Sequence, residues 1–120
     1  MAVQTATGWD NAGALADLSV QPRVYLPEPG RRRRAGDGLT YIDGALVQRM
    51  TYGYLTKANY TTTLTEMGVA SAESAKMTVR TLGRDGTEAN WNAIITRPPA
   101  PELFQKVLGI EFEVLLVEAL

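Results

Sequence analysis

Two segments in the second half of the chain alternate between apolar and other residues. Every second residue is apolar between positions 89 and 95, and again between positions 110 and 116. A period of two is typical of a β-strand with one face in the core, because successive side chains point to opposite faces of the sheet. We therefore expect two long strands, with Trp91, Phe112 and Val114 as core residues.

Short glycine-containing turns indicate that the strands pair in an antiparallel way. Gly83 to Gly86 separate residues 76–82 from residues 87–96, and Asp43-Gly44 separates residues 39–42 from residues 45–54. An Asp-Gly pair supplies the positive φ angles of a type I′ turn, so two β-hairpins are predicted. On the strand over residues 45–54, Tyr52 is the expected core residue.

One helix is expected at about residues 56–67, between the two hairpins. Thr56 can cap its N-terminus, and Tyr60, Leu64 and Met67 repeat at helical spacing. Gly68 is placed to end the helix in a left-handed conformation. The predicted fold class is thus mainly β (α+β): an antiparallel β sandwich or barrel with one flanking helix, and with Leu64 and Met67 in the core.

Residues 1–21 show neither the period of two of a strand nor the spacing of a helix, and they are expected to form an extended N-terminal arm. This leaves residues 22–120 as a single β domain, a usual size for one hydrophobic core. Trp9, Leu15 and Leu18 indicate that the arm lies on a surface, either of its own domain or of a neighbouring subunit.

An extended basic loop is expected over residues 27–38. It contains Arg31, Arg32, Arg33 and Arg34, which are four of the twelve basic residues. The other eight basic residues are outnumbered by the thirteen acidic residues of the chain. The guanidinium groups could hold phosphates of a nucleic acid. A solvated loop, or a contact with acidic residues of an adjacent subunit, is favoured because no aromatic residue lies between the arginines.

The composition argues against catalysis. The chain has no cysteine and no histidine, so it has no thiolate, and it lacks both the commonest general base and the commonest transition-metal ligand. Ser71, Ser74 and Lys76 are interpreted as a polar loop. We expect no enzymatic activity, no metal and no cofactor. We also expect no membrane contact, because the longest apolar run, residues 114–117, is far too short to span a bilayer.

Four short patterns resemble small tail proteins of long-tailed bacteriophages. They are Asp43-Gly44, Gly53-Tyr54-Leu55-Thr56, Lys76-Met77-Thr78-Val79-Arg80-Thr81 and Ala89-Asn90-Trp91-Asn92-Ala93-Ile94-Ile95. The resemblance implies a tail-tube-like β domain with a flanking helix, whose rings of six stack into a conduit for DNA. It also implies a virion protein made in the host cytoplasm that contacts its own copies, other virion proteins and, transiently, DNA.

In that family an arm and a long loop bridge successive rings. The resemblance therefore makes Trp9, Leu15, Leu18 and Arg31–Arg34 candidate inter-subunit contacts. Tube lumens tend to be acidic, so the arginines are expected on an inter-ring or outer surface.

Other functions stay open. A neck, terminator or capsid-stabilising virion protein fits the same pattern, and a nucleic-acid-binding module could use Arg31–Arg34. A carbohydrate-binding module could stack sugars on Trp9 and Trp91, although Trp91 lies on an apolar stripe.

Overall fold

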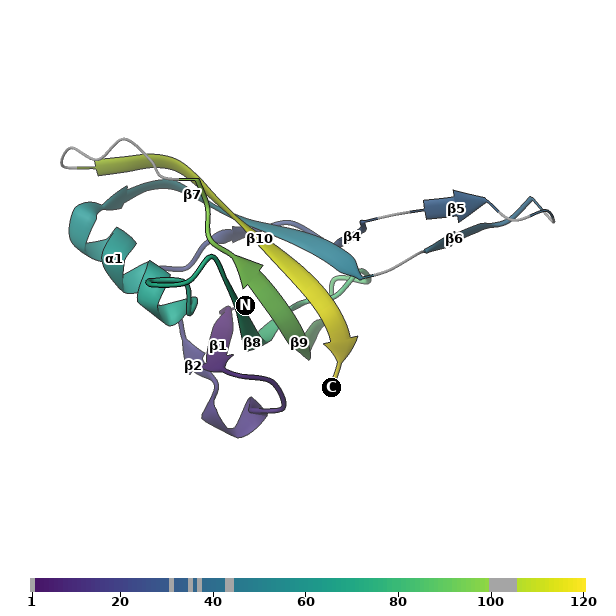
Figure 1. Ribbon diagram of the computed structural model, residues 1–120, viewed down its shortest axis with the longest axis horizontal. Helices are drawn as coiled ribbons and strands as arrows, with labels where there is room; N and C mark the ends of the chain where they lie inside the picture. The colour runs from purple at the N-terminus through teal and green to yellow at the C-terminus, as the bar shows by residue number, and fades with distance from the viewer. Residues whose placement is uncertain (1, 31, 35, 37, 43–44, 100–105) are drawn as a thin grey trace.

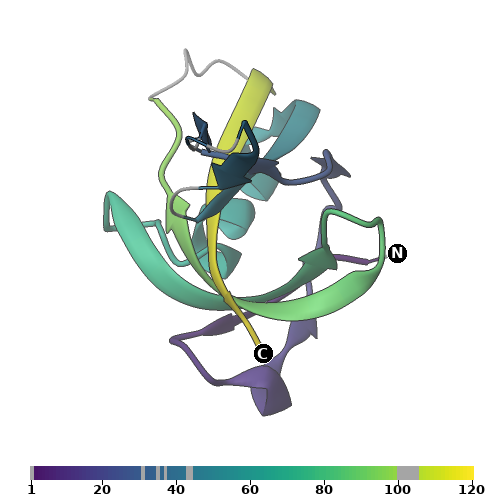
Figure 2. The same cartoon turned by 90° about the vertical axis from the view of Figure 1, so that its right-hand side faces the viewer.

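The computed structural model describes residues 2–30, 32–34, 36, 38–42, 45–99 and 106–120. The protein is mostly β, with 51% of its residues in strands and one α-helix, α1 (Lys57–Glu66). The strands are antiparallel, and the main sheet curls around the core, with α1 against its concave side (Figure 1, Figure 2). The predicted fold class is confirmed.

The main sheet has eight strands among the described residues. Their order is β2-β1-β8-β9-β10-β7-β3, and β4 also pairs with β7. Their bounds are β1 (Gln4–Thr7), β2 (Ala16–Asp17), β3 (Arg23–Val24), β4 (Glu28–Pro29), β7 (Leu46–Thr56), β8 (Ser74–Leu82), β9 (Glu88–Thr96) and β10 (Lys106–Ala119). The two longest of these strands, β7 and β10, pair with each other along most of their length.

The hairpin predicted around residues 83–86 is present as β8 and β9, with Leu82 opposite Glu88. Gly86 has a φ of +82°, and the Gly83 amide donates to the Thr87 carbonyl at 2.8 Å. The Asp85 carboxylate accepts from the Thr87 amide, and this hydrogen bond lowers the pKa of Asp85. The turn chemistry read from the sequence therefore forms this hairpin.

The other predicted hairpin is wrong. Strand β6 (Thr40–Ile42) pairs with β5 (Arg32–Arg34) in a separate two-stranded sheet, whereas β7 pairs with β10, β3 and β4. Asp43-Gly44 itself lies outside the described residues. The segment expected as a basic loop instead contains β4 and β5.

The pairing pattern explains this correction. Arg33 lies opposite Tyr41, Pro29 opposite Leu46 and Arg23 opposite Thr51. These pairings share one antiparallel register, except that the pairing of β4 with β7 is shifted by one residue. The described pairs thus follow one another along a ribbon, with β3, β4 and β5 on one side and β7 and β6 on the other. The partners of β6 and β7 are set by the summed pairing of these distant strands, whereas the predicted hairpin was based on a local turn preference alone.

The helix begins and ends as predicted. The Thr56 hydroxyl accepts a hydrogen bond from the Asn59 amide at 3.2 Å. After α1, Gly68 has a φ of +79°, and a Cβ added there would lie 2.7 Å from the Met77 sulfur. Glycine is therefore needed at this position both for its backbone conformation and for its packing.

The N-terminal segment is part of the domain, not a separate arm. β1 pairs with β8 on one side, with Thr5 opposite Val79, and with β2 on the other. Between β1 and β2 lies a short 3-10 helix, η1 (Ala12–Ala14). The division expected at residue 21 therefore does not separate an arm from the fold.

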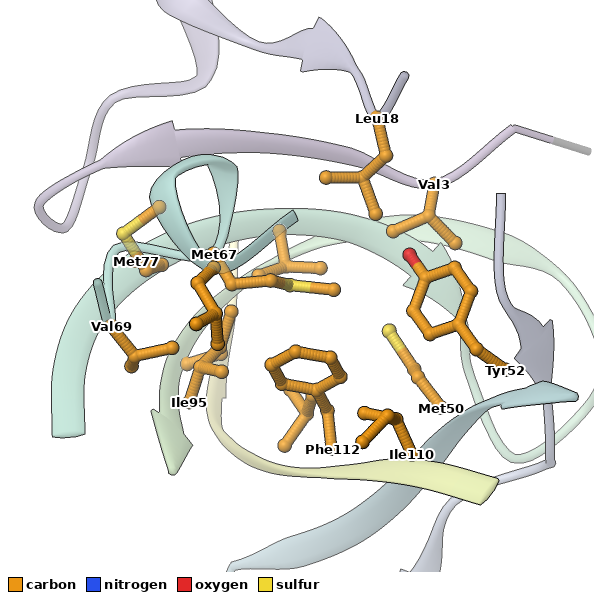
Figure 3. Packing of buried hydrophobic residues seen from close by; sticks show 14 of the residues in the cluster. Val3, Leu18, Met50, Tyr52, Met67, Val69, Met77, Ile95, Ile110 and Phe112 are labelled. Atoms are coloured by element: carbon orange, nitrogen blue, oxygen red, sulfur yellow. The ribbon is translucent and has the colours of Figure 1, made fainter. Parts of the chain in front are cut away.

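A single cluster of buried apolar residues fills the space between the curled sheet and α1 (Figure 3). Of the expected core residues, Tyr52, Leu64, Met67, Phe112 and Val114 are buried. The rings of Tyr52 and Phe112 meet edge to face, with centroids 6.1 Å apart.

Trp91 is not the buried anchor that its alternation predicts. It is half-buried and packs against the edge of the cluster. Its indole Nε1 is buried without a hydrogen-bond partner among the described residues.

Candidate functional site

The β5–β6 hairpin projects from the end of the domain along its long axis (Figure 1). The molecule measures 54 × 32 × 26 Å. Arg32, Arg33 and Arg34 form β5, and the Arg34 side chain is exposed. Arg31 lies outside the described residues. This basic hairpin is the most prominent surface feature of the protein.

A buried amide anchors the base of the ribbon that carries the hairpin. Gln48 on β7 is fully buried, and its side-chain nitrogen donates to the carbonyls of Tyr25 and Leu82 at 2.9 and 3.0 Å. Its side-chain oxygen accepts from the Thr81 hydroxyl at 2.9 Å. The residue thus joins the ribbon to β8, which is not a neighbour of β7 in the sheet.

Sequence reasoning missed this role of Gln48. The available signal was a glutamine at an alternating position between Leu46 and Met50, on a face that is otherwise largely apolar. A polar side chain on such a face is buried at a cost unless it is hydrogen-bonded.

Trp9 is held by contacts within its own chain. Its indole Nε1 donates to the Ala93 carbonyl at 2.9 Å, and the Lys76 ammonium lies 4.7 Å from the ring centroid. Next to it, Asp10 and Asn92 exchange two hydrogen bonds of 2.9 and 3.0 Å. The segment around Trp9 is thereby fastened to β9.

The other two apolar candidates of the N-terminal segment differ in burial. Leu18 is a core residue beside Val3 and Tyr52 (Figure 3), so the interpretation as an inter-subunit contact is corrected. Leu15 is half-buried.

An open groove of about 800 Å³ lies on the surface of the main sheet. Its lining includes three exposed carboxylates, those of Glu73, Glu111 and Glu113, together with Pro98 and Pro99. We call this the acidic groove. Its charge is opposite to that of the β5–β6 hairpin.

The basic groups near the acidic groove only partly offset this charge. The Arg97 guanidinium lines the groove and donates to the carbonyls of Val69 and Ala70. Arg49 lies 3.7 Å from Glu111, and both side chains are largely exposed, so the pair contributes little to stability. Within the described part of the chain, the carboxylates of Glu73 and Glu113 form no ion pair.

Six large apolar side chains are exposed among the described residues. They are Tyr25, Leu26, Leu39, Tyr54, Val117 and Leu120. Single exposed apolar residues are common on soluble domains, so these positions do not define a site by themselves.

The described residues contain no group of three or more carboxylates that could hold a metal ion. Their one α-helix is too short and too polar to cross a membrane. Comparisons with family models, with curated proteins and with solved structures found no match to the chain.

Proposed function

We propose that the chain is a structural virion protein of a bacteriophage tail, a tube subunit that assembles into stacked hexameric rings around the DNA. The pattern resemblance supports this proposal, and so does a β domain with a projecting β-arm. In a monomer, such an arm exposes strand edges that promote aggregation. In an assembly it can form a contact between subunits, because it offers backbone and side chains to a neighbour.

The β5–β6 hairpin is the observation that carries the proposal. Its two strands pair with each other in a sheet of their own. A two-stranded hairpin is at best marginally stable in water without a surface to pack on. A neighbouring subunit would supply that surface, so the shape of the monomer favours assembly.

The proposal assigns the bridging role to the hairpin and not to the N-terminal segment. Trp9 and Leu18 are already used inside the subunit, through the Ala93 carbonyl and the core. Arg32 to Arg34 would then face an inter-ring or outer surface, because arginines that lined a channel would hold the phosphates of passing DNA.

Electron microscopy of the purified protein, combined with its mass in solution, tests this proposal. Rings or tubes of defined diameter are the expected result. A monodisperse monomer under all salt and concentration conditions would refute it. Rings that never stack would favour the alternative of a neck, terminator or capsid-stabilising protein.

A nucleic-acid-binding module is the second candidate, favoured by three consecutive arginines on a projecting hairpin. It predicts an affinity for DNA that falls steeply with salt, because each phosphate contact releases counterions. A fluorescence-anisotropy titration at several salt concentrations separates the two, since a tail protein should show little binding at physiological ionic strength.

The sugar-binding alternative has less support. Trp9 carries Lys76 over its ring, and Trp91 packs against the core, so both rings have partners within the chain.

A further inference from the structure

We propose that the β5–β6 hairpin of one copy docks into the acidic groove of the next copy, with β5 as the basic element of the contact. The inference rests on the proposed function and specifies the partner of the hairpin. It makes the contact heterologous, because two different surfaces of the same chain meet.

Charge complementarity selects this occupant. β5 consists of three arginines, whereas the lining of the groove includes three carboxylates, those of Glu73, Glu111 and Glu113, and one basic residue, Arg97. Glu73 and Glu113 have no basic partner in the described part of their own chain. Opposite potentials steer docking and set its register, and guanidinium groups pair with carboxylates through two parallel hydrogen bonds.

The contact must be made between copies. The hairpin extends away from the main sheet at one end of the 54 Å axis (Figure 1). The groove is instead lined by residues at the end of β9 and in the middle of β10. The ribbon is fixed at its base by Gln48 and by pairing of β3 and β4 with β7. The structure thus places the hairpin away from the groove of its own chain, and we assign the groove of a second copy as its partner.

Heterologous docking gives assemblies that continue from copy to copy, either closing into rings or extending as stacks. Each contact between exposed charges is weak and screened by salt. Repetition around a ring would make the total large, so assembly should weaken as ionic strength rises.

Complementary charge reversal tests the docking. The hairpin variant R33E/R34E has an acidic hairpin and an acidic groove, and the groove variant E73K/E113K has a basic groove and a basic hairpin. Neither variant should assemble alone. An equimolar mixture should assemble, because each hairpin then meets a groove of opposite charge on the other variant.

The control is K57E/R84E, which changes the net charge by as much as R33E/R34E does but at exposed positions outside both surfaces. It should assemble like the parent chain, as measured by sedimentation velocity and electron microscopy. Circular dichroism checks that every variant keeps the β-rich fold.

The outcomes separate the two proposals. A parent chain that never assembles refutes the proposed function and this inference together. A parent chain that assembles, with R33E/R34E assembling equally well, refutes the inference alone. The inference is also refuted if the equimolar mixture does not assemble although both single variants are folded. It is refuted as well if R33E/R34E assembles like the parent chain but binds DNA more weakly in the anisotropy titration.

Discussion

The Thr81 hydroxyl donates a 2.9 Å hydrogen bond to the side-chain oxygen of Gln48. The two residues come from β8 and β7, which are separated in the sheet by β9 and β10. The bond therefore links, inside the protein, two strands that do not pair with each other in the sheet. The first prediction concerns this link.

Replacing Gln48 with alanine should lower the free energy of unfolding by about 3 kcal/mol. The change leaves the carbonyls of Tyr25 and Leu82 and the Thr81 hydroxyl without their partner, and unsatisfied buried polar groups are costly. Urea denaturation measures the effect. Gln4→Ala is the matched control, because Gln4 bonds an exposed carboxylate and should change stability by less than about 0.5 kcal/mol. Equal effects of the two changes would contradict the role of Gln48.

Replacing Gly68 with alanine should lower stability by about 3 kcal/mol, through the left-handed backbone and the close approach to the Met77 sulfur. Gly86→Ala is the control, since Gly86 has nearly the same φ but open space around it. It should cost only about 1 kcal/mol. Thermal or urea unfolding measures the loss of stability in both variants. The difference between the two losses gives the cost of the close contact with Met77, and the prediction fails if the two losses are the same.

Leu18→Ala should lower stability by about 3 kcal/mol, because Leu18 is buried in the core and truncation leaves a cavity. Leu15→Ala, a few residues away and half-buried, should cost about 1 kcal/mol. Urea unfolding of the monomer compares them. If Leu18→Ala left stability unchanged and weakened only assembly, the N-terminal segment would be an inter-subunit arm after all.

Stability should fall between pH 10 and pH 12. Burial, with a smaller contribution from the charge of Glu66, raises the pKa of Tyr52 from 10.0 to about 12. In this interval the unfolded chain loses the phenolic proton while the folded chain keeps it, so each step up in pH favours unfolding. The hydroxyl also donates to the Val20 carbonyl at 2.8 Å.

Urea midpoints of the parent chain and of Tyr52→Phe, measured from pH 8 to pH 11.5, check this prediction. The variant should be less stable at pH 8, because it loses the hydrogen bond, and its stability should fall less steeply above pH 10. Tyr54→Phe is the control, since Tyr54 is exposed. Identical slopes for all three proteins would contradict the assignment to Tyr52.

The elements that depend on neighbours along the chain were predictable. The cap at Thr56, the end of α1 at Gly68 and the turn at residues 83–86 form as expected, because each rests on contacts within a few residues. The alternation of residues 110–116 likewise predicted β10, with Phe112 and Val114 in the core.

The candidate site was predictable only in part. The sequence indicated a basic surface element, but Arg32 to Arg34 lie on a paired strand, where a loop was expected. The acidic groove was not foreseen, because Glu73 and Glu113 come from segments 40 positions apart in the sequence. Nothing in the local pattern shows that such residues line one groove.

The sequence by itself determined the class of the fold, the helix with its two ends, and the hairpin of β8 and β9. Only the tertiary structure decided that β6 pairs with β5, that β1 joins the sheet beside β8, and that a basic hairpin projects from a domain with an acidic groove. The reason is physical. Turns and caps are set by local backbone preferences, whereas the partner of a strand is chosen by the total pairing and burial of distant segments.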